Sequence, residues 1–146
     1  MSAAGISTEQ VKSFLEAYAS AFQRLDKDAV AERYAYPAHV VTHNGGVRSL
    51  AVPTREAWTA VIERILQMYG AMGVRRAEMR DLRVVNISPL VAQARLVWAL
   101  RGDGDTPLYE FDASYTIALF DGELKIVHVI SENEQPKFQG VMRARG

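Results

Sequence analysis

The chain has no cysteine among its 146 residues. Disulfide bonds, iron–sulfur clusters, thiolate zinc sites and cysteine nucleophiles are therefore excluded. No run of apolar residues approaches the ~20 that a membrane-spanning helix needs. The first five residues have neither the basic region nor the apolar stretch of a secretion signal. We expect a cytoplasmic protein with no membrane partner.

Charge of one sign is also lacking, because 17 basic residues balance 17 acidic ones. A formal net charge of zero provides no long-range attraction to nucleic acid or to an anionic membrane. Four arginines between residues 75 and 83 are interleaved with Glu78 and Asp81. This pattern is typical of a solvated strand face, and we expect no nucleic-acid partner.

The composition is that of a globular protein, with 49% hydrophobic and 23% charged residues. The length suits a single domain, which we place over residues 1–146. An ordered core is expected from about residue 7 to residue 135, followed by a loose tail over residues 136–146.

Three segments carry apolar residues at helical spacing. The first helix is predicted to begin after Ser7, which can form a capping box with Gln10. A short second helix is expected over residues 27–34. The third begins after Thr54 and ends by Gly73. Each has one apolar stripe that must be covered.

Alternating patterns indicate strands. A hairpin is predicted with strands over 38–42 and 47–52, and four long strands over 75–86, 90–101, 108–120 and 124–131. Helices segregated from a run of strands indicate an α+β fold. Because long strands twist and curl, we predict a strongly curved, mostly antiparallel sheet with the three helices packed on its concave face. This cone-shaped domain would be hollow at its wide end.

Three local stretches are typical of one superfamily. They are the first helix leading into residues 25–28, the pair Tyr36 and Pro37 before the first strand, and the hairpin sequence DGELKIVH at 121–128. In these stretches the chain resembles the nuclear-transport-factor-2-like (NTF2-like) superfamily, and within it the SnoaL-like group, over about residues 8–133. The resemblance implies a cystatin-like α+β cone, usually a homodimer through the outer sheet face. Members include isomerases, cyclases, dehydratases and non-catalytic modules, so the fold does not choose the chemistry.

Ketosteroid isomerase is the member with the best-defined chemistry, and the resemblance to it is partial. There a tyrosine on the first helix and a protonated acid hold an enolate oxygen while a carboxylate moves the proton. Tyr18 lies at the tyrosine position. The base position falls near Thr42 and His43, and the second acid falls on Thr116, with Asp112 four residues back on the same face. That mechanism is not expected unless His43 or Asp112 substitutes.

His128 is the most informative single residue for chemistry. It shares strand parity with Ile126, on the face that the apolar pattern predicts to be covered. It could be an acid–base group, or a core histidine bonded to Tyr18, Asp112 or a backbone carbonyl. We name His128 as the candidate acid–base group, Asp112 as its partner and Tyr18 as the hydrogen-bond donor. Glu132, at the end of the same strand, is expected at the solvated rim.

The strand over 108–120 has two alternating rows, and either could face the cavity. One row is aromatic and apolar, and the other is polar, comprising Glu110, Asp112, Ser114 and Thr116. The polar row lines the cavity if the aromatic row forms a dimer interface. Alternatively, the aromatic row is core and the polar row is solvated. The resemblance favours the first arrangement.

A metal site is not expected. His39 and His43 are four residues apart in an extended segment, so they point the same way but stand about 13 Å from each other. Two such side chains cannot share a tetrahedral ion. No other ligand set is apparent, and we expect no cofactor.

Several aromatic residues could wall a hydrophobic pocket, or could be plain core. The candidate ligand-binding residues are Tyr34, Tyr36, Trp58, Tyr69, Trp98 and Thr116. We predict a domain that binds an uncharged or weakly acidic ring compound. Within this hypothesis, the domain could act as an acid–base isomerase, cyclase or dehydratase. The competing class is a non-catalytic dimerisation or assembly module whose cone is filled by its own side chains. Plugging of the cone by Trp58, Trp98 and Tyr34 would favour that second class.

Overall fold

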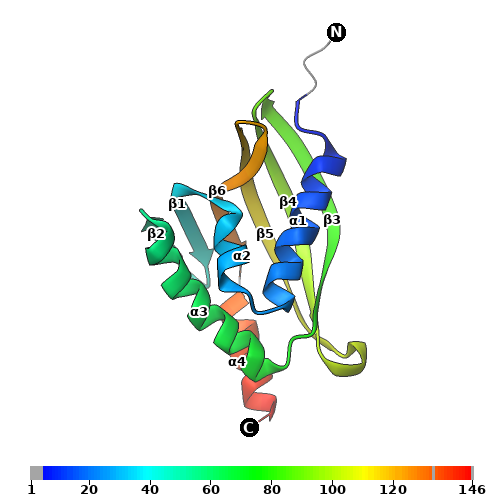
Figure 1. Ribbon diagram of the computed structural model, residues 1–146. Helices are drawn as coiled ribbons and strands as arrows, with labels where there is room; N and C mark the ends of the chain where they lie inside the picture. Colours follow the sequence, from blue (N-terminus) through cyan, green and yellow to red (C-terminus); the bar gives the residue numbers. More distant parts are fainter. Residues whose placement is uncertain (1–4, 133, 146) are drawn as a thin grey trace.

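The computed structural model describes residues 5–132 and 134–145 (Figure 1). This part of the chain has an α+β fold with four α-helices and six strands. The helices are α1 (Thr8–Gln23), α2 (Lys27–Glu32), α3 (Arg55–Met72) and α4 (Glu134–Arg145), and a 3-10 turn η1 (Asp103–Asp105) joins two strands. The strands are β1 (Tyr34–His43), β2 (Val47–Val52), β3 (Arg76–Ser88), β4 (Val91–Arg101), β5 (Pro107–Phe120) and β6 (Glu123–Glu132).

The six strands form one sheet in the order β2-β1-β6-β5-β4-β3. Every neighbouring pair is antiparallel except β1 and β6, which are parallel. The sheet curls without closing, and α1, α2 and α3 lie across its concave side (Figure 1). The predicted α+β class and the arrangement of the three helices are confirmed. No described helix is long and apolar enough to cross a membrane.

Local signals set the helix ends as expected. Ser7 accepts a hydrogen bond from the Gln10 backbone while the Gln10 side chain accepts one from Ser7, which completes the capping box. Thr54 caps α3 at its start. Gly73 follows α3 in the left-handed conformation at φ 80°, which glycine adopts without steric cost.

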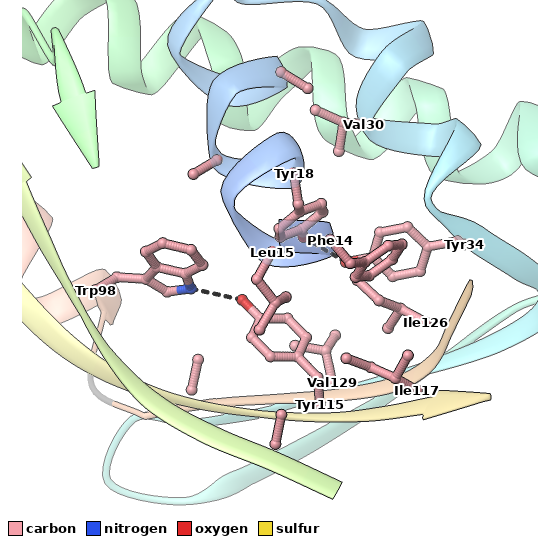
Figure 2. Packing of buried hydrophobic residues seen from close by; sticks show 14 of the residues in the cluster. Phe14, Leu15, Tyr18, Val30, Tyr34, Trp98, Tyr115, Ile117, Ile126 and Val129 are labelled. Atoms are coloured by element: carbon pink, nitrogen blue, oxygen red, sulfur yellow. Dashed lines mark hydrogen bonds between the residues drawn. The ribbon is translucent and has the colours of Figure 1, made fainter. Parts of the chain in front are cut away.

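The core lies between the helices and the concave sheet face (Figure 2). Leu15 of α1 and Ile62 of α3 are fully buried, as are Leu96 of β4 and Ile117 of β5. Burying such a side chain contributes about 1.5–3 kcal/mol. The apolar row of β4 therefore faces inward, as its alternation predicts.

Two elements differ from the expectation. Helix α2 ends at Glu32 instead of near residue 34, because Tyr34 already pairs with Ile126 of β6 and the Ile126 N–H donates to the Arg33 carbonyl. Sheet pairing thus overrides helical propensity. In place of a loose tail, residues from Glu134 form α4, which Lys137 ties to β5 by donating to the Glu110 carbonyl.

Candidate functional site

A cavity of about 250 Å³ lies between the helices and the sheet. It is mostly apolar, and nineteen residues line it: Tyr18, Ala19, Phe22, Tyr34, Val40, Thr42, Asn44, Trp58, Ile65, Met68, Tyr69, Ala77, Trp98, Leu100, Phe111, Tyr115, Val129, Ser131 and Glu134. Protein interiors rarely leave a void of this size, so the cavity is a candidate binding site.

One aromatic group of the wall comes from three elements. Tyr18 of α1 and Tyr34 at the start of β1 share a hydrogen bond between their hydroxyl oxygens, 2.6 Å apart. The ring of Trp58 from α3 packs against Tyr34 at 5.3 Å between centroids. Burial raises the pKa of both tyrosines. Their hydroxyls therefore stay neutral and act as hydrogen-bonding groups.

The second aromatic group comes from the sheet. Trp98 of β4 donates its indole N–H to the hydroxyl of Tyr115 on β5, at 2.7 Å (Figure 2). The Tyr115 ring also packs edge-on against Tyr18, 5.8 Å away. Sheet and helix are thus joined by rings whose polar atoms are partnered.

Glu134, the first residue of α4, contributes a carboxyl group to the cavity lining. Tyr69 of α3 and Tyr109 of β5 both donate to its Oε2, at 2.6 and 2.8 Å. The residue is partly exposed, but its carboxyl group is enclosed, and this burial raises the pKa of Glu134 while the two tyrosine hydrogen bonds lower it. A carboxyl group in this setting can hold or release a proton closer to neutral pH than usual.

Sequence reasoning missed Glu134, which lies between the end of the last predicted strand at residue 131 and the tail expected from residue 136. Glu132, two residues earlier, was predicted at the solvated rim; it lies at the end of β6 on the outer sheet face, 3.1 Å from Arg95. The available signal was a glutamate just past the end of the last strand. Nothing in its neighbours along the chain shows that Tyr69 and Tyr109 surround it.

A bulge in β6 decides which side chains face the cavity. Ile117 pairs with Ile126, but Thr116 pairs with His128, so Val127 is an extra residue. Strand parity therefore changes at this point, and His128 lies on the opposite face from the buried Ile126. The prediction that His128 shares the face of Ile126 is wrong for this reason.

The polar row of β5 also lies on the outer face. Phe111, Ala113, Tyr115 and Ile117 are buried, whereas Asp112 and Thr116 on the alternate row are partly exposed. The favoured arrangement, with the polar row lining the cavity, is wrong, and the aromatic row is core. Because Tyr18 lies in the cavity, the structure does not bring the candidate set Tyr18, Asp112 and His128 together.

Outside the cavity, these residues have other partners. His128 stacks on His39 with 5.3 Å between ring centroids, and burial together with His39 lowers the pKa of His128. Asp112 lies 3.9 Å from Arg95. The outer sheet face therefore carries a polar and charged cluster on β1, β4, β5 and β6.

Four of the six candidate ligand-binding residues line the cavity, namely Tyr34, Trp58, Tyr69 and Trp98. Tyr36 and Thr116 do not. Tyr36 donates to the Ala31 carbonyl at 2.9 Å, and Thr116 donates to the Gln93 side chain at 2.9 Å on the outer face. Ligand contact by any of the six stays a prediction.

The described residues contain no group of three or more His, Asp or Glu that could hold a metal ion. His43 lies 3.9 Å from Glu132, and His39 contacts Ser49 and His128. The homodimer through the outer sheet face stays a prediction.

Comparisons with known proteins agree with this fold. A family model described as NTF2-like protein (DUF6841) matches residues 8–134. No curated protein matches the sequence at a significant level.

Among solved structures, an NTF2-like protein of unknown function from Pseudomonas putida KT2440 is 18% identical, with a TM-score of 0.68, covering 88% of this chain and 89% of its own. A protein from Novosphingobium aromaticivorans named "Putative Scytalone Dehydratase" is 14% identical, with a TM-score of 0.61 over 83% of this chain and 79% of its own. A Xanthomonas campestris protein named "Putative calcium/calmodulin dependent protein kinase II association domain" is 15% identical, with a TM-score of 0.61 over 90% of this chain and 96% of its own. At these identities the likeness shows the fold alone.

Proposed function

We propose, from the premise that the chain belongs to the family described as NTF2-like protein (DUF6841), that this domain binds a small hydrophobic ring compound inside its cavity. The family description assigns no activity. The proposal therefore depends on the site of this chain and not on the activity of a relative.

A single observation carries the proposal: the cavity is a mostly apolar, aromatic chamber whose described lining includes one carboxyl group, that of Glu134. Ligand sites are typically apolar with a few placed polar groups that fix orientation. Trp58, Trp98 and Tyr34 line this chamber and leave it open, which favours binding over an assembly module with a filled cone.

The test places a larger side chain in the cavity and measures whether a ring compound still binds. Ala19 is 7% exposed and lines the chamber from α1, so Ala19→Leu would occupy part of it. We expect tetralin at ten times its Kd to stabilise the natural protein by about 1.4 kcal/mol, a Tm increase of about 4 °C in a thermal-shift assay. The increase should be lost in Ala19→Leu. Ala60→Leu, at an exposed position of α3 outside the cavity, is the matched control and should keep it.

No increase for the natural protein with tetralin or with other neutral ring compounds would contradict the proposal. An undiminished increase in Ala19→Leu would show that the compound binds elsewhere.

A second candidate function is acid–base catalysis on the bound ring. Two observations favour it: the raised pKa of Glu134, and the Tyr18–Tyr34 pair, in which only one hydroxyl can donate to the other. The remaining hydroxyl proton is available to a ligand oxygen. In this scheme the Glu134 carboxylate takes a proton from the carbon next to a carbonyl, the electron pair moves to the carbonyl oxygen, and a tyrosine hydroxyl donates to that oxygen.

The corresponding test follows deuterium exchange at the carbon next to the carbonyl of α-tetralone by NMR in heavy water. We expect Glu134→Gln to slow the enzyme-dependent exchange by about 100-fold or more, and Tyr18→Phe to slow it less. Glu132→Gln removes the same charge on the outer face and should leave exchange unchanged. Exchange no faster than in buffer would contradict catalysis while leaving binding intact.

A further inference from the structure

The charge of the cavity wall is one-sided. Among the nineteen described lining residues, Glu134 is the single acid, and none is Lys, Arg or His. An anionic ligand would have to leave water without gaining an opposite charge, and it would meet the carboxylate. The wall therefore disfavours carboxylate and phosphate ligands.

The same wall is rich in aromatic rings that extend to the carboxyl group. Eight of the nineteen residues are aromatic. Phe22 packs against Tyr18 at 5.1 Å and against Tyr69 at 5.8 Å between centroids, and Tyr69 donates to Glu134. Aromatic faces attract organic cations, most strongly where water is excluded. Rings and a carboxylate together are the chemistry that binds an ammonium group.

Glu134 has no cationic partner in the described part of the chain. Its two hydrogen-bond donors, Tyr69 and Tyr109, are neutral, so they orient the carboxylate without neutralising it. A buried carboxylate is costly unless it is paired with a positive charge. A ligand cation would provide that charge.

We infer that the ligand is a ring compound bearing an ammonium group, which pairs with the Glu134 carboxylate among the aromatic side chains of the cavity. This inference rests on the proposed function and names the class of compound that the same site takes. The apolar ring would lie against the aromatic walls, with the ammonium beside the Glu134 carboxylate.

The test compares two probes that differ in charge but not in shape. Benzyltrimethylammonium carries a quaternary nitrogen where neopentylbenzene carries a carbon. Both tryptophans of the chain line the cavity, so intrinsic fluorescence reports on its occupancy. We expect the natural protein to bind the cation at least tenfold more tightly than the neutral isostere.

Variants identify the group responsible. Glu134→Gln keeps an oxygen that can accept from the two tyrosines but removes the charge, and it should weaken binding of the cation about tenfold or more. Binding of neopentylbenzene should change by less than twofold. Glu132→Gln is the matched control, since it removes a charge two residues away on the outer face and should leave both affinities unchanged.

The outcomes separate this inference from the proposed function. If the two probes bind equally, or if only the isostere binds, the ammonium assignment is wrong and cavity binding stands. If Glu134→Gln binds the cation as tightly as the natural protein does, the assignment is also wrong. If neither probe binds, both proposals fail. The probe comparison on the natural protein decides even if Glu134→Gln does not fold.

Discussion

Glu134 differs from the other described acids of this chain. Its carboxyl group accepts hydrogen bonds from two tyrosines and has no cationic partner among the described residues. Exposed acids such as Glu32 gain cationic partners, and hydrogen bonds from Lys125 and Arg55 lower the pKa of Glu32. In Glu134, burial is the larger influence, and it raises the pKa. The pKa values of these two glutamates are therefore shifted in opposite directions.

The raised pKa of Glu134 makes stability depend on pH. Its pKa in the folded protein exceeds the value of 4.5 expected for the unfolded chain, so the folded state binds this proton more tightly. The contribution of this proton is complete below pH 4.5 and is lost as pH rises through the folded pKa. Relative to Glu134→Gln, which cannot titrate, the natural protein should lose Tm as pH rises above 4.5.

Thermal melts of both proteins across the range from pH 4.5 to 8 check this prediction. Tyr69 and Tyr109, which face the carboxyl group, and the nearby Tyr115 stay neutral over this range because the pKa of each is raised. A constant Tm difference between the two proteins would contradict it.

Single residues were predictable where a regular pattern positions them. Helical spacing placed Tyr18 and Trp58 on the covered side of their helices, and the alternation of β4 placed Trp98 inward. Glu134 could not be found in this way, because its surroundings come from Tyr69 and Tyr109, which are distant in the sequence. Chemistry that depends on such long-range contacts leaves no local pattern.

At the scale of the element, the end of α3 positions one side of the site. Gly73 donates its N–H to Tyr69 and Gly70, and the Val74 N–H also donates to Tyr69. This ending requires the left-handed φ of 80° at Gly73. The backbone of the residue that holds Glu134 is therefore fixed by a glycine four residues later.

Gly73→Ala should destabilise the protein by about 1–2 kcal/mol, because a side chain is strained in the left-handed region. Gly70→Ala is the paired control: it lies inside α3 and is exposed, and its new methyl group would meet only Leu25 at 3.9 Å. Alanine there should stabilise the helix by about 0.5 kcal/mol. Urea unfolding of both variants measures the two effects, and equal changes would contradict the assigned role of Gly73.

The types and order of the helices and strands were predictable from the spacing of apolar residues and from the helix-capping residues. Which face of the sheet each side chain of β6 would occupy was not. The hairpin turn at Asp121 and Gly122, both with positive φ, was evident from sequence. The extra residue at Val127 was not, because Val127 continues an ordinary apolar run. Parity counted through it therefore assigned His128 to the wrong side.

At the scale of the whole molecule, the curled sheet has an inner face that lines the cavity and an outer face on its other side. The outer face mixes charged pairs such as Arg95 and Glu132 with half-buried apolar residues such as Val97 and Ile130. Charged pairs around apolar residues can give an interface its specificity.

We predict a homodimer through this face. Light scattering should give twice the chain mass of 16.2 kDa. Replacing both Val97 and Ile130 with glutamate should give the monomer mass while leaving the response to tetralin intact, because neither residue lines the cavity. A mass of 16.2 kDa for the natural protein at micromolar concentration would contradict the prediction.

The extra residue in β6 also affects how roles are transferred between relatives. Since Val127 is absorbed outside the pairing, its removal would leave Ile126 opposite Ile117 and His128 opposite Thr116. A relative one residue shorter here could present the same inner and outer surfaces. Numbering forward from the hairpin would then equate residues from opposite sides of the two molecules, whereas matching each residue through its cross-strand neighbour would equate true counterparts.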